Sequence, residues 1–269
     1  MAFCSDPRLT YLNGLGYNVL KLPREGVDPL EVVGRDNDSL EDLGQISTIW
    51  SSKAAVPQVA PPAQAVDING QRTSDLKVSI GLDILASILQ GMGIDAPKVT
   101  AEYNQAKSIQ FTFTDVQVSR VPPLEVGSYL AQGDLDQQNP FASYFQDHNK
   151  EAYVITEVLK SQSITVTAKG SSGTTLAVNL PNIQKVVGVN ASIAASASDN
   201  ASLTYKGQKL LTFGFKVFGI AYANGSWQIH GQAPAGNIAF SLPSEPGPVL
   251  LSDGQLLENF RPKATKTHA

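Results

Sequence analysis

The sequence predicts an α+β fold, in which a twisted and mostly antiparallel β-sheet carries peripheral helices and a short C-terminal segment lies across the sheet. Four blocks alternate apolar and polar residues over most of their length, at 108–121, 151–169, 187–206 and 210–222. Side chains of a strand point alternately to opposite faces, so this alternation indicates strands with one apolar face. A fifth block, 79–92, has its apolar residues at helical spacing, and the last part of the chain is rich in proline.

The block 187–206 is longer than the strands of ordinary sheets, which average about 5–6 residues. Its apolar residues share one parity: Val187, Val189, Ala191, Ile193, Ala195, Ala197, Ala201, Leu203 and Tyr205. A division at Asp199-Asn200 predicts a hairpin or a bent ribbon. Each arm then has about the 9–11 residues of a transmembrane β-strand, but the pattern equally fits a long ribbon of a soluble domain. The block alone leaves both interpretations open.

The N-terminal part of the chain predicts short strands. Strands are expected at 17–22, 28–33 and 45–50. The last of them is followed by a loop, because prolines bar a central strand there: Pro57, Pro61 and Pro62.

A helix is expected at 79–92, where isoleucine and leucine form a broad stripe and Gly91 and Gly93 end the pattern. A stripe of this kind normally packs against a core.

Turn signals interrupt the alternating blocks. In 108–121 the apolar parity slips at Thr114-Asp115, which indicates a β-bulge. Gly207 is expected to end the strand of 187–206. Asn224-Gly225 predicts a tight hairpin turn with a short returning strand after it. Further short helices are expected at 124–132, at 140–146 and from Leu180 onward.

The composition excludes several classes of protein. Charged residues make up 16% of the 269 residues, against about 25% in typical domains. The net charge of −4 indicates no basic surface for nucleic acid, so no nucleic-acid partner is expected. No apolar run reaches the roughly 18 residues of a membrane-spanning helix, and the start MAFCSDPRLT lacks the pattern of a secretory signal. We therefore expect a cytoplasmic protein.

No pattern in the sequence predicts an enzyme. The three histidines, His148, His230 and His268, are isolated and form no metal-ligand spacing. Neither a nucleophile elbow nor a phosphate-binding loop is present, and Cys4 has no histidine placed by sequence to activate it. We therefore predict no catalytic residue, no metal site and no cofactor.

The C-terminal part of the chain changes character after about residue 237. Pro243, Pro246 and Pro248 predict a segment that stays off the central sheet, is exposed and is accessible to proteases. Beyond it, Leu256, Leu257 and Phe260 form a small apolar face suited to docking in a groove.

Cys4 is the only cysteine, which rules out an internal disulfide. A lone cysteine is often a small buried hydrophobe. Close to the terminus and beside Phe3, it is also suited to S-acylation. A single acyl chain binds membranes only marginally, so it would assist another membrane element.

The first thirty residues resemble the bacterial gasdermins. The likeness lies in Cys4, in the Asp6-Pro7 pair, in T-Y-L at 10–12 and in L-G-Y-N-V-L-K-L-P-R-E-G-V-D-P-L at 15–30. Further along the chain the likeness is one of pattern, with a helix, long alternating strands and a short tail.

The resemblance implies a pore-forming effector that inhibits itself. Residues 1–250 would form a pore-forming domain like the N-terminal domain of gasdermins, and residues 251–269 an inhibitory peptide. A partner protease would remove the peptide, and the remainder would oligomerise into a β-barrel pore in the bacterial inner membrane. The death of the cell would limit the spread of phage. The lipidated cysteine of the family corresponds to Cys4, with palmitate as the expected acyl chain.

If the resemblance holds, the cut falls near 249–254. The candidate bonds follow Leu250, Leu251 or Asp253, and the activating protease would be caspase-like or trypsin-like. Asp253-Gly254 suits a caspase-like enzyme. A trypsin-like cut at Arg261 or Lys263 would leave the apolar anchor attached and should not activate the protein.

The alternating blocks resemble the two hairpins that animal gasdermins extend through the membrane. The residues expected to face lipid are Ile109, Phe111, Phe113, Ile164, Val166, Val189, Ile193, Ala195, Leu203, Phe213, Phe215 and Val217. The alternative is a soluble, non-enzymatic β-rich binding or self-assembling module. It predicts no dependence on lipid and no gain of activity when the tail is removed.

Overall fold

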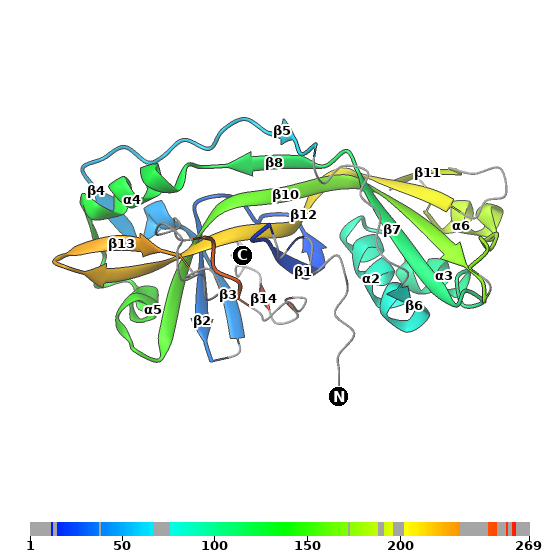
Figure 1. Ribbon diagram of the computed structural model, residues 1–269, viewed down its shortest axis with the longest axis horizontal. Coiled ribbons are helices and arrows are strands. Elements are labelled where there is room, and N and C mark those ends of the chain that lie inside the picture. The colour runs from blue at the N-terminus through cyan, green and yellow to red at the C-terminus, as the bar shows by residue number, and fades with distance from the viewer. Residues whose placement is uncertain are drawn as a thin grey trace, which may run out of the picture.

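Two long antiparallel strands form the spine of the molecule in the computed structural model (Figure 1). The structure describes residues 12, 15–37, 39–66, 76–171, 173–187, 191–195, 202–231, 247–251, 257, 260 and 261. The spine strands are β10 (Lys150–Lys169) and β12 (Ser202–Ala223). Both carry the alternation of polar and apolar residues noted in the sequence, and the prediction of a mostly antiparallel sheet with peripheral helices is confirmed.

The neighbours of the spine change along its length. Beside β10 lie, in turn, β2 (Glu31–Asp36), β8 (Gln117–Arg120) and β7 (Ser108–Thr114). Beside β12 lie β13 (Ser226–His230), β1 (Asn18–Arg24) and β11 (Ala191–Ala195). On the far side of β2 the sheet continues with β3 (Ser39–Gln45) and the two-residue β14 (Phe260–Arg261), which is parallel to β3.

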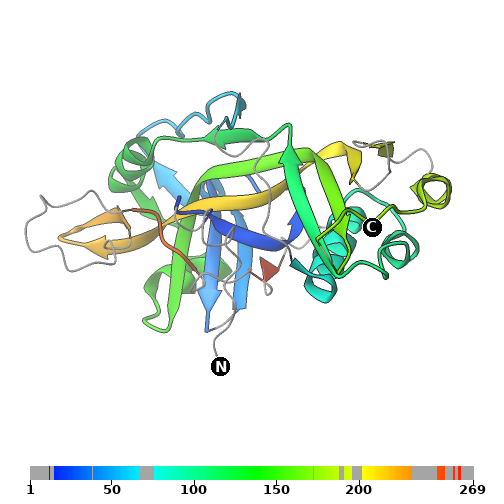
Figure 2. The ribbon, with the colours of Figure 1, turned by 45° about the vertical axis from the view of Figure 1, so that its right-hand side comes forward.

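Helices gather at the two ends of the elongated molecule, as Figures 1 and 2 show. At one end, α2 (Val78–Gly91), α3 (Ala96–Ala101) and α6 (Leu180–Val187) pack with the far halves of the spine strands. At the other end lie α4 (Pro123–Ala131), α5 (Ser143–Gln146), η1 (Ile46–Thr48) and η2 (Pro140–Ala142). The remaining short strands are β4 (Trp50–Ser52) with β9 (Gly133–Leu135), β5 (Ala63–Gln64) and β6 (Leu76–Lys77).

The middle of the sheet is covered on both faces. Along β10, Ala152 and Val154 pack into one cluster together with Val126 and Leu130 of α4. The residues between and beyond them, Tyr153 and Ile155, point the other way, as successive side chains of a strand must. On that second face they meet Leu257 and Phe260, so the C-terminal segment covers one face of the sheet.

Several predicted elements are confirmed within one to three residues. The helix at 79–92 is α2, the short helices at 124–132 and 140–146 are α4 and η2–α5, and the turn at Asn224-Gly225 joins β12 to β13. Both turn residues have positive φ, 51° and 80°, which the primed hairpin turns require. The block 187–206 is split between α6, β11 and the start of β12, and β11 pairs with β12 as a hairpin.

Three local predictions are wrong. Gly207 does not end a strand, because β12 runs through it and joins two predicted blocks. Residues 45–50 form the 3₁₀ helix η1 between two strands instead of one strand. The slip at Thr114-Asp115 is not an inserted residue, since β7 and β8 keep one register along β10. Asp115 there takes φ 54°, and the Ser161 hydroxyl donates to the Thr114 carbonyl at 2.6 Å across the gap.

Candidate functional site: the groove that holds the C-terminal segment

The C-terminal segment adds a strand-like piece to the spine at Val249. The Val249 N–H donates to the Val217 carbonyl at 2.8 Å, and the two residues form an antiparallel bridge. Val217 lies between the part of β12 paired with β1 and the part paired with β13. The proline-rich segment predicted to stay off the sheet lies largely outside the described residues, and Val249, which follows its last proline and keeps its N–H donor, pairs with β12.

Asn18 holds the same stretch with its side chain. Its Nδ2 donates to the Val249 carbonyl at 2.8 Å, and its Oδ1 accepts the Leu251 N–H at 2.6 Å. A side-chain amide offers a donor and an acceptor as a peptide group does, so Asn18 takes the place of a neighbouring strand. It is 1% exposed, and a buried amide deprived of these partners would bear the full cost of desolvation.

Tyr17 fixes the backbone next to this amide. The Tyr17 hydroxyl donates to Glu157 of β10, and Lys216 of β12 lies 3.1 Å from the same carboxylate. The Lys216 ammonium also sits 4.3 Å from the centre of the Tyr17 ring. These contacts hold the start of β1 against both spine strands. They involve no residue of the tail, so they position Asn18 independently of it.

Leu257 is the first of two buried anchors. It is 6% exposed and packs with Leu20, Phe215 and Val217. Its N–H donates to the Val19 carbonyl at 2.9 Å, and it forms a parallel bridge with Leu20. The tail therefore covers the outer edge of β1 as well as the edge of β12.

Phe260 is the second anchor, at 4% exposed. Its ring lies 5.6 Å from the ring of Phe215, and its backbone pairs with Leu40 of β3. Arg24 contacts it twice. The guanidinium Nη2 donates to the Phe260 carbonyl at 2.7 Å, and the guanidinium carbon lies 5.0 Å from the centre of the ring. One arginine thus binds both the backbone and the ring of the tail.

Burial of Arg24 changes its pKa. Desolvation lowers the pKa of its guanidinium from the usual value, and the nearby Asp42 carboxylate opposes that shift. Asp42 is itself buried at 7% exposure and accepts the Gly44 N–H at 2.9 Å. Nη1 of Arg24 is buried without a hydrogen-bond partner among the described residues. Arg24 is therefore a costly cation whose contacts with Phe260 compensate part of its desolvation.

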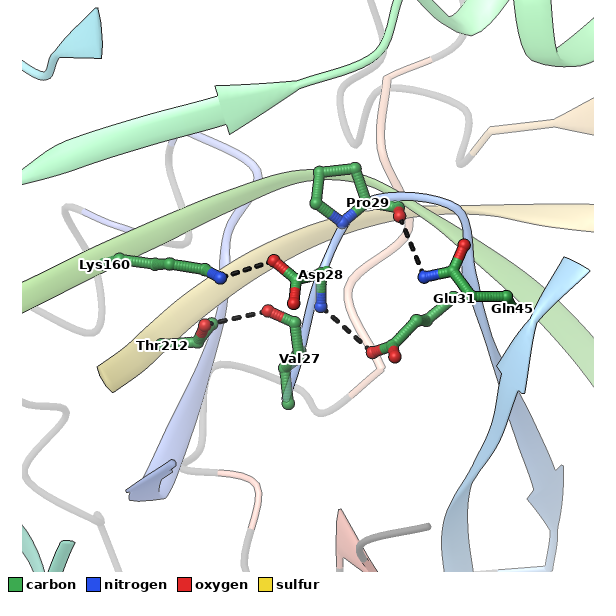
Figure 3. A network of polar contacts seen from close by, with 7 residues as sticks. All are labelled: Val27, Asp28, Pro29, Glu31, Gln45, Lys160 and Thr212. Atoms are coloured by element: carbon green, nitrogen blue, oxygen red, sulfur yellow. Dashed lines mark hydrogen bonds and ion pairs between the residues drawn. The ribbon is translucent and has the colours of Figure 1, made fainter. Parts of the chain in front are cut away.

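The wall of the groove is formed without the tail. Figure 3 shows the loop from Val27 to Glu31, whose Asp28 carboxylate pairs with Lys160 of β10. Thr212 of β12 donates to the Val27 carbonyl at 2.9 Å, and the Asp28 N–H donates to Glu31 at 3.0 Å. Val27 is 1% exposed and belongs to the cluster that contains Leu257 and Phe260. This loop gives the groove a fixed shape.

Gly16 is required where the tail crosses the N-terminal part of the chain. Its φ is 82°, and a Cβ built on it would lie 2.3 Å from Cγ of Pro248. A side chain there would both strain the backbone and push the tail away.

The sequence did not single out Gly16, Asn18 or Arg24 as functional residues. All three lie within 15–30, the segment that carries the family resemblance. Their spacing follows no motif, because each acts on a partner more than 200 residues away in the chain.

The predicted regulatory residues fall in three places. Leu257 and Phe260 lie in the groove, and the candidate cleavage residues Leu250 and Leu251 are half-buried beside Asn18. Among the described residues, Pro248 and Val249 already contact the sheet domain, before the predicted domain boundary at 250–251. Cys4, Asp253 and Leu256 lie outside the described residues.

Most of the residues predicted to face lipid lie in the hydrophobic clusters of this structure. Ile109, Phe111, Ile164, Val166 and Leu203 are buried against α2, α3 and α6. Phe213, Phe215 and Val217 are buried in the middle of the sheet, and Phe113 and Ile193 are partly buried. Val189 lies outside the described residues, and of Ala195 the structure describes the backbone.

Other features of the described residues point to no second centre. They contain no group of three or more His, Cys, Asp or Glu side chains placed to hold a metal ion. None of their helices has the length and hydropathy needed to cross a membrane. A cleft of about 680 Å³ between α5, β10 and β13 has His148 and His230 on its border and is separate from the groove.

Comparisons with known proteins agree on one family. Residues 20–228 match the family model described as Bacterial Gasdermin Family. A Gasdermin bGSDM from Vitiosangium sp. (strain GDMCC 1.1324) is 41% identical over 259 residues, covering 96% of each chain. Another from a Desulfuromonadales bacterium is 33% identical over 263 residues, covering 95% of this chain and 98% of that one.

The fold is shared with a solved protein. The structure of a bacterial gasdermin from Bradyrhizobium tropiciagri matches with a TM-score of 0.62 at 14% identity, covering 83% of this chain and 90% of that one.

Proposed function

Because the chain belongs to the bacterial gasdermin family, whose members form pores and are not enzymes, we propose that its groove and tail make it an effector activated by proteolysis. The family resemblance predicted from the first thirty residues is confirmed by the matches. The proposal adds that the C-terminal segment is the inhibitor, that a protease releases it, and that the remaining domain then inserts into a membrane.

The observation that carries the proposal is a core cluster that the tail completes. Leu257 and Phe260 are as buried as the sheet residues around them, and Val249 and Leu251 pack at the edge of the same cluster. Without the tail, Phe215 and Val217 of the spine would face water. The groove would then be an exposed apolar patch beside uncovered strand edges, and both features promote association.

Cleavage acts through effective concentration. While the chain is intact, the two anchors are tethered close to their groove and rebind whenever they leave. After a cut between Leu251 and Leu257, the released peptide must bind from solution, where its concentration is very low. Several weak contacts that suffice in one chain then no longer hold the protein closed.

The position of the contacts favours a cut at 252–256. Leu250 and Leu251 are half-buried, and the Leu251 N–H donates to Asn18, whereas Asp253-Gly254 comes in the sequence between Leu251 and the first anchor, Leu257. A cut after Asp253 would free Leu257 and Phe260 together. This supports the caspase-like protease over a trypsin-like enzyme acting at Arg261, which would leave both anchors on the domain.

Membrane insertion requires a closed arrangement of strands. Backbone groups in lipid must all be hydrogen-bonded, and strands achieve this only when they close into a barrel. The activated domains would therefore form a homo-oligomer in the lipid. A palmitoyl group on Cys4 would lower the cost of insertion by about 0.8 kcal/mol for each buried CH₂.

In the cell, the closed protein would be cytoplasmic and the activated protein would lie in the inner membrane. Permeabilisation of that membrane kills the cell, which would limit the spread of a phage that triggers the protease. The residues in this proposal that lie outside the described part of the chain, Cys4 above all, come from the family resemblance.

Dye release from liposomes tests the proposal. Acylated full-length protein is compared with acylated protein truncated after Leu251, in vesicles of bacterial polar lipids. We expect release by the truncated protein and none by the full-length protein. Silence of the truncated protein and of a nested series of shorter tails would instead support the soluble binding module.

Cys4→Ala separates lipidation from folding. We expect weaker release by the truncated protein and an unchanged thermal unfolding transition of the full-length protein. Equal release with and without the cysteine would remove acylation from the mechanism and leave the tail as the sole regulator.

A further inference from the structure

A cleft lies at one end of the molecule, between α5, the start of β10 and the β12–β13 hairpin (Figure 1). Its volume is about 680 Å³, within the range of about 300–1,000 Å³ that ligand pockets commonly have. Among the described residues it holds no group of three side chains placed to bind a metal ion. Its aromatic and charged side chains therefore decide which ligand it suits.

Aromatic side chains form one wall of the cleft. Trp227 of β13 is 8% exposed, and its ring lies 6.2 Å from the ring of Phe145 and 5.3 Å from the ring of Tyr222. Trp50, which does not line the cleft, packs against Trp227 at 5.1 Å. Tyr222 of β12, by contrast, is 62% exposed. An exposed ring that packs against a buried tryptophan is typical of the aromatic residues that bind partners.

Two cations of the protein already lie against rings that line the cleft. The Lys150 ammonium is 4.8 Å from the centre of the Tyr144 ring and 3.3 Å from a carboxylate oxygen of Asp36. The guanidinium carbon of Arg35 is 5.6 Å from the centre of the Tyr153 ring, and this arginine pairs with a carboxylate of β10. In both cases a ring and a carboxylate hold the cation together.

A third set of rings and carboxylates in the cleft has no cation. Asp134 of β9 and Asp147, which follows α5, line the cleft and have no ion-pair partner among the described residues. Asp147 accepts the Asn149 N–H at 2.9 Å, but this neutral donor leaves its charge uncompensated. In the same part of the chain no cation lies over the ring of Tyr222 or Trp227. The cleft thus offers two carboxylates and two rings to a cation from outside.

We propose that this cleft binds an arginine side chain on a peptide segment of a partner protein. The planar guanidinium can stack on Tyr222 or Trp227 and form two parallel hydrogen bonds with a carboxylate, which the ammonium of a lysine cannot do. The volume of the cleft leaves room for the residues beside the arginine, which favours a peptide over a free amino acid. The inference goes beyond pore formation and does not depend on it.

Titration of the uncut, full-length protein with a short peptide tests the inference. The probe is acetyl-Leu-Arg-Leu-amide, and its control carries citrulline, whose neutral urea group has nearly the shape of a guanidinium. Tryptophan fluorescence reports binding, because Trp227 lines the cleft and the one other tryptophan, Trp50, contacts it. We expect a saturable change with a Kd of about 0.1 mM and about tenfold weaker binding of the citrulline peptide. Equal binding of the two peptides would overturn the recognition of a cation.

Asp134→Asn combined with Asp147→Asn removes both charges and keeps the acceptor for the Asn149 N–H. We expect about tenfold weaker binding of the arginine peptide. Asp136→Asn is the matched control, because Asp136 is exposed, accepts the Gln138 N–H at 3.0 Å in the same way, and does not line the cleft. It should bind like wild type. If it weakens binding as much as the double variant, the peptide follows the general surface charge and the cleft is not its site.

Tyr222→Ala tests the ring. We expect about threefold weaker binding, the contribution of a cation–π contact at an exposed site, and an unchanged thermal unfolding transition. Phe141→Ala removes the other exposed aromatic side chain of the described residues, lies outside the cleft lining and should leave binding unchanged. Unchanged binding by the Tyr222 variant would overturn the stacking. N-acetyl-arginine amide forms the last arm of the titration. If it binds as tightly as the peptide, the ligand is a free guanidinium compound and not a partner protein.

Discussion

The tail and residues 53–66, which we call the strap and which run along the outer edge of β8, cover edges of the same sheet with different chemistry. The tail contributes two buried anchors, Leu257 and Phe260. Asn18 and Arg24 donate hydrogen bonds to its backbone carbonyls. The strap contributes backbone hydrogen bonds and leaves its valines in solvent. Apolar burial of a large side chain stabilises by about 1.5–3 kcal/mol, whereas a backbone hydrogen bond gives about 1 kcal/mol net.

This difference fits the proposed mechanism, in which a protease releases the tail. Phe260 is seated against Phe215 and Arg24, so we expect the tail to stay bound until its tether is cut. The strap has no comparable buried anchor. The comparison predicts large effects for substitutions in the tail and its groove, and small ones in the strap.

Phe260→Ala should have the largest effect. Removal of a buried aromatic ring costs about 3–5 kcal/mol, here partly as lost contacts with Phe215 and Arg24. Urea unfolding of the uncut protein should show a loss near the lower value, because the tail can also open locally. A loss of about 3 kcal/mol raises the open population roughly hundredfold, so uncut protein should begin to release dye.

Phe141→Ala is the control for that variant, because Phe141 is 43% exposed and lies outside the groove. It should unfold like wild type within about 0.5 kcal/mol and stay silent on vesicles until cut. Equal behaviour of the two alanine variants would show that the tail is held by something other than its anchor.

Asn18→Ala should have a smaller effect than Phe260→Ala. It removes both side-chain contacts with the tail and leaves the Val249 carbonyl and the Leu251 N–H without these partners, at a cost of about 2 kcal/mol. Asn104→Ala, at an exposed turn position after α3, serves as the comparison and should be neutral. The measurement is urea unfolding of both uncut proteins. A neutral Asn18 variant would mean that water replaces the amide without loss.

The same residues show which features of the fold and of the groove could be predicted from the sequence. Alternation and helical spacing are local properties, so they predicted the spine blocks, α2 and the β12–β13 turn. The apolar spacing of Leu257 and Phe260 likewise marked a docking face. Asn18 could not be recognised, since its role depends on a backbone segment more than 200 residues away that only the folded sheet brings beside it.

The errors have the same origin. Gly207 breaks the local pattern and lies where the register between β10 and β12 shifts, but it pairs with Ala191 of β11, and β12 therefore runs through it. The strap was interpreted as a loop because prolines bar a central strand. That rule holds for the middle of a sheet, whereas the strap uses its remaining N–H groups to cover an edge. Tertiary pairing, which no single stretch encodes, decided both cases.

Arg24→Lys should have a moderate effect. The substitution keeps the positive charge, so it tests the geometry of the contacts with Phe260 and not the charge itself. Lysine cannot keep both the bond to the Phe260 carbonyl and the stacking on its ring, so we expect a loss of about 1 kcal/mol and a slight leak of uncut protein on vesicles. Arg35→Lys is a close control, since Arg35 also lies over a tyrosine ring and pairs with a carboxylate, but does so away from the tail. It should not leak. If both variants leak equally, general destabilisation and not the groove is responsible.

Val59→Ser in the strap should have the smallest effect. Val59 is 40% exposed, and the substitution changes no backbone donor, so the free energy of unfolding should stay within about 0.5 kcal/mol of wild type. Leu257→Ser changes a residue that is 6% exposed and should cost about 3 kcal/mol by the same measurement. The contrast between these two apolar-to-serine changes follows from burial alone, because each residue lies in a segment that covers a strand edge. A loss above 1 kcal/mol for Val59→Ser would mean that the strap is anchored by its side chains as well as by its backbone hydrogen bonds.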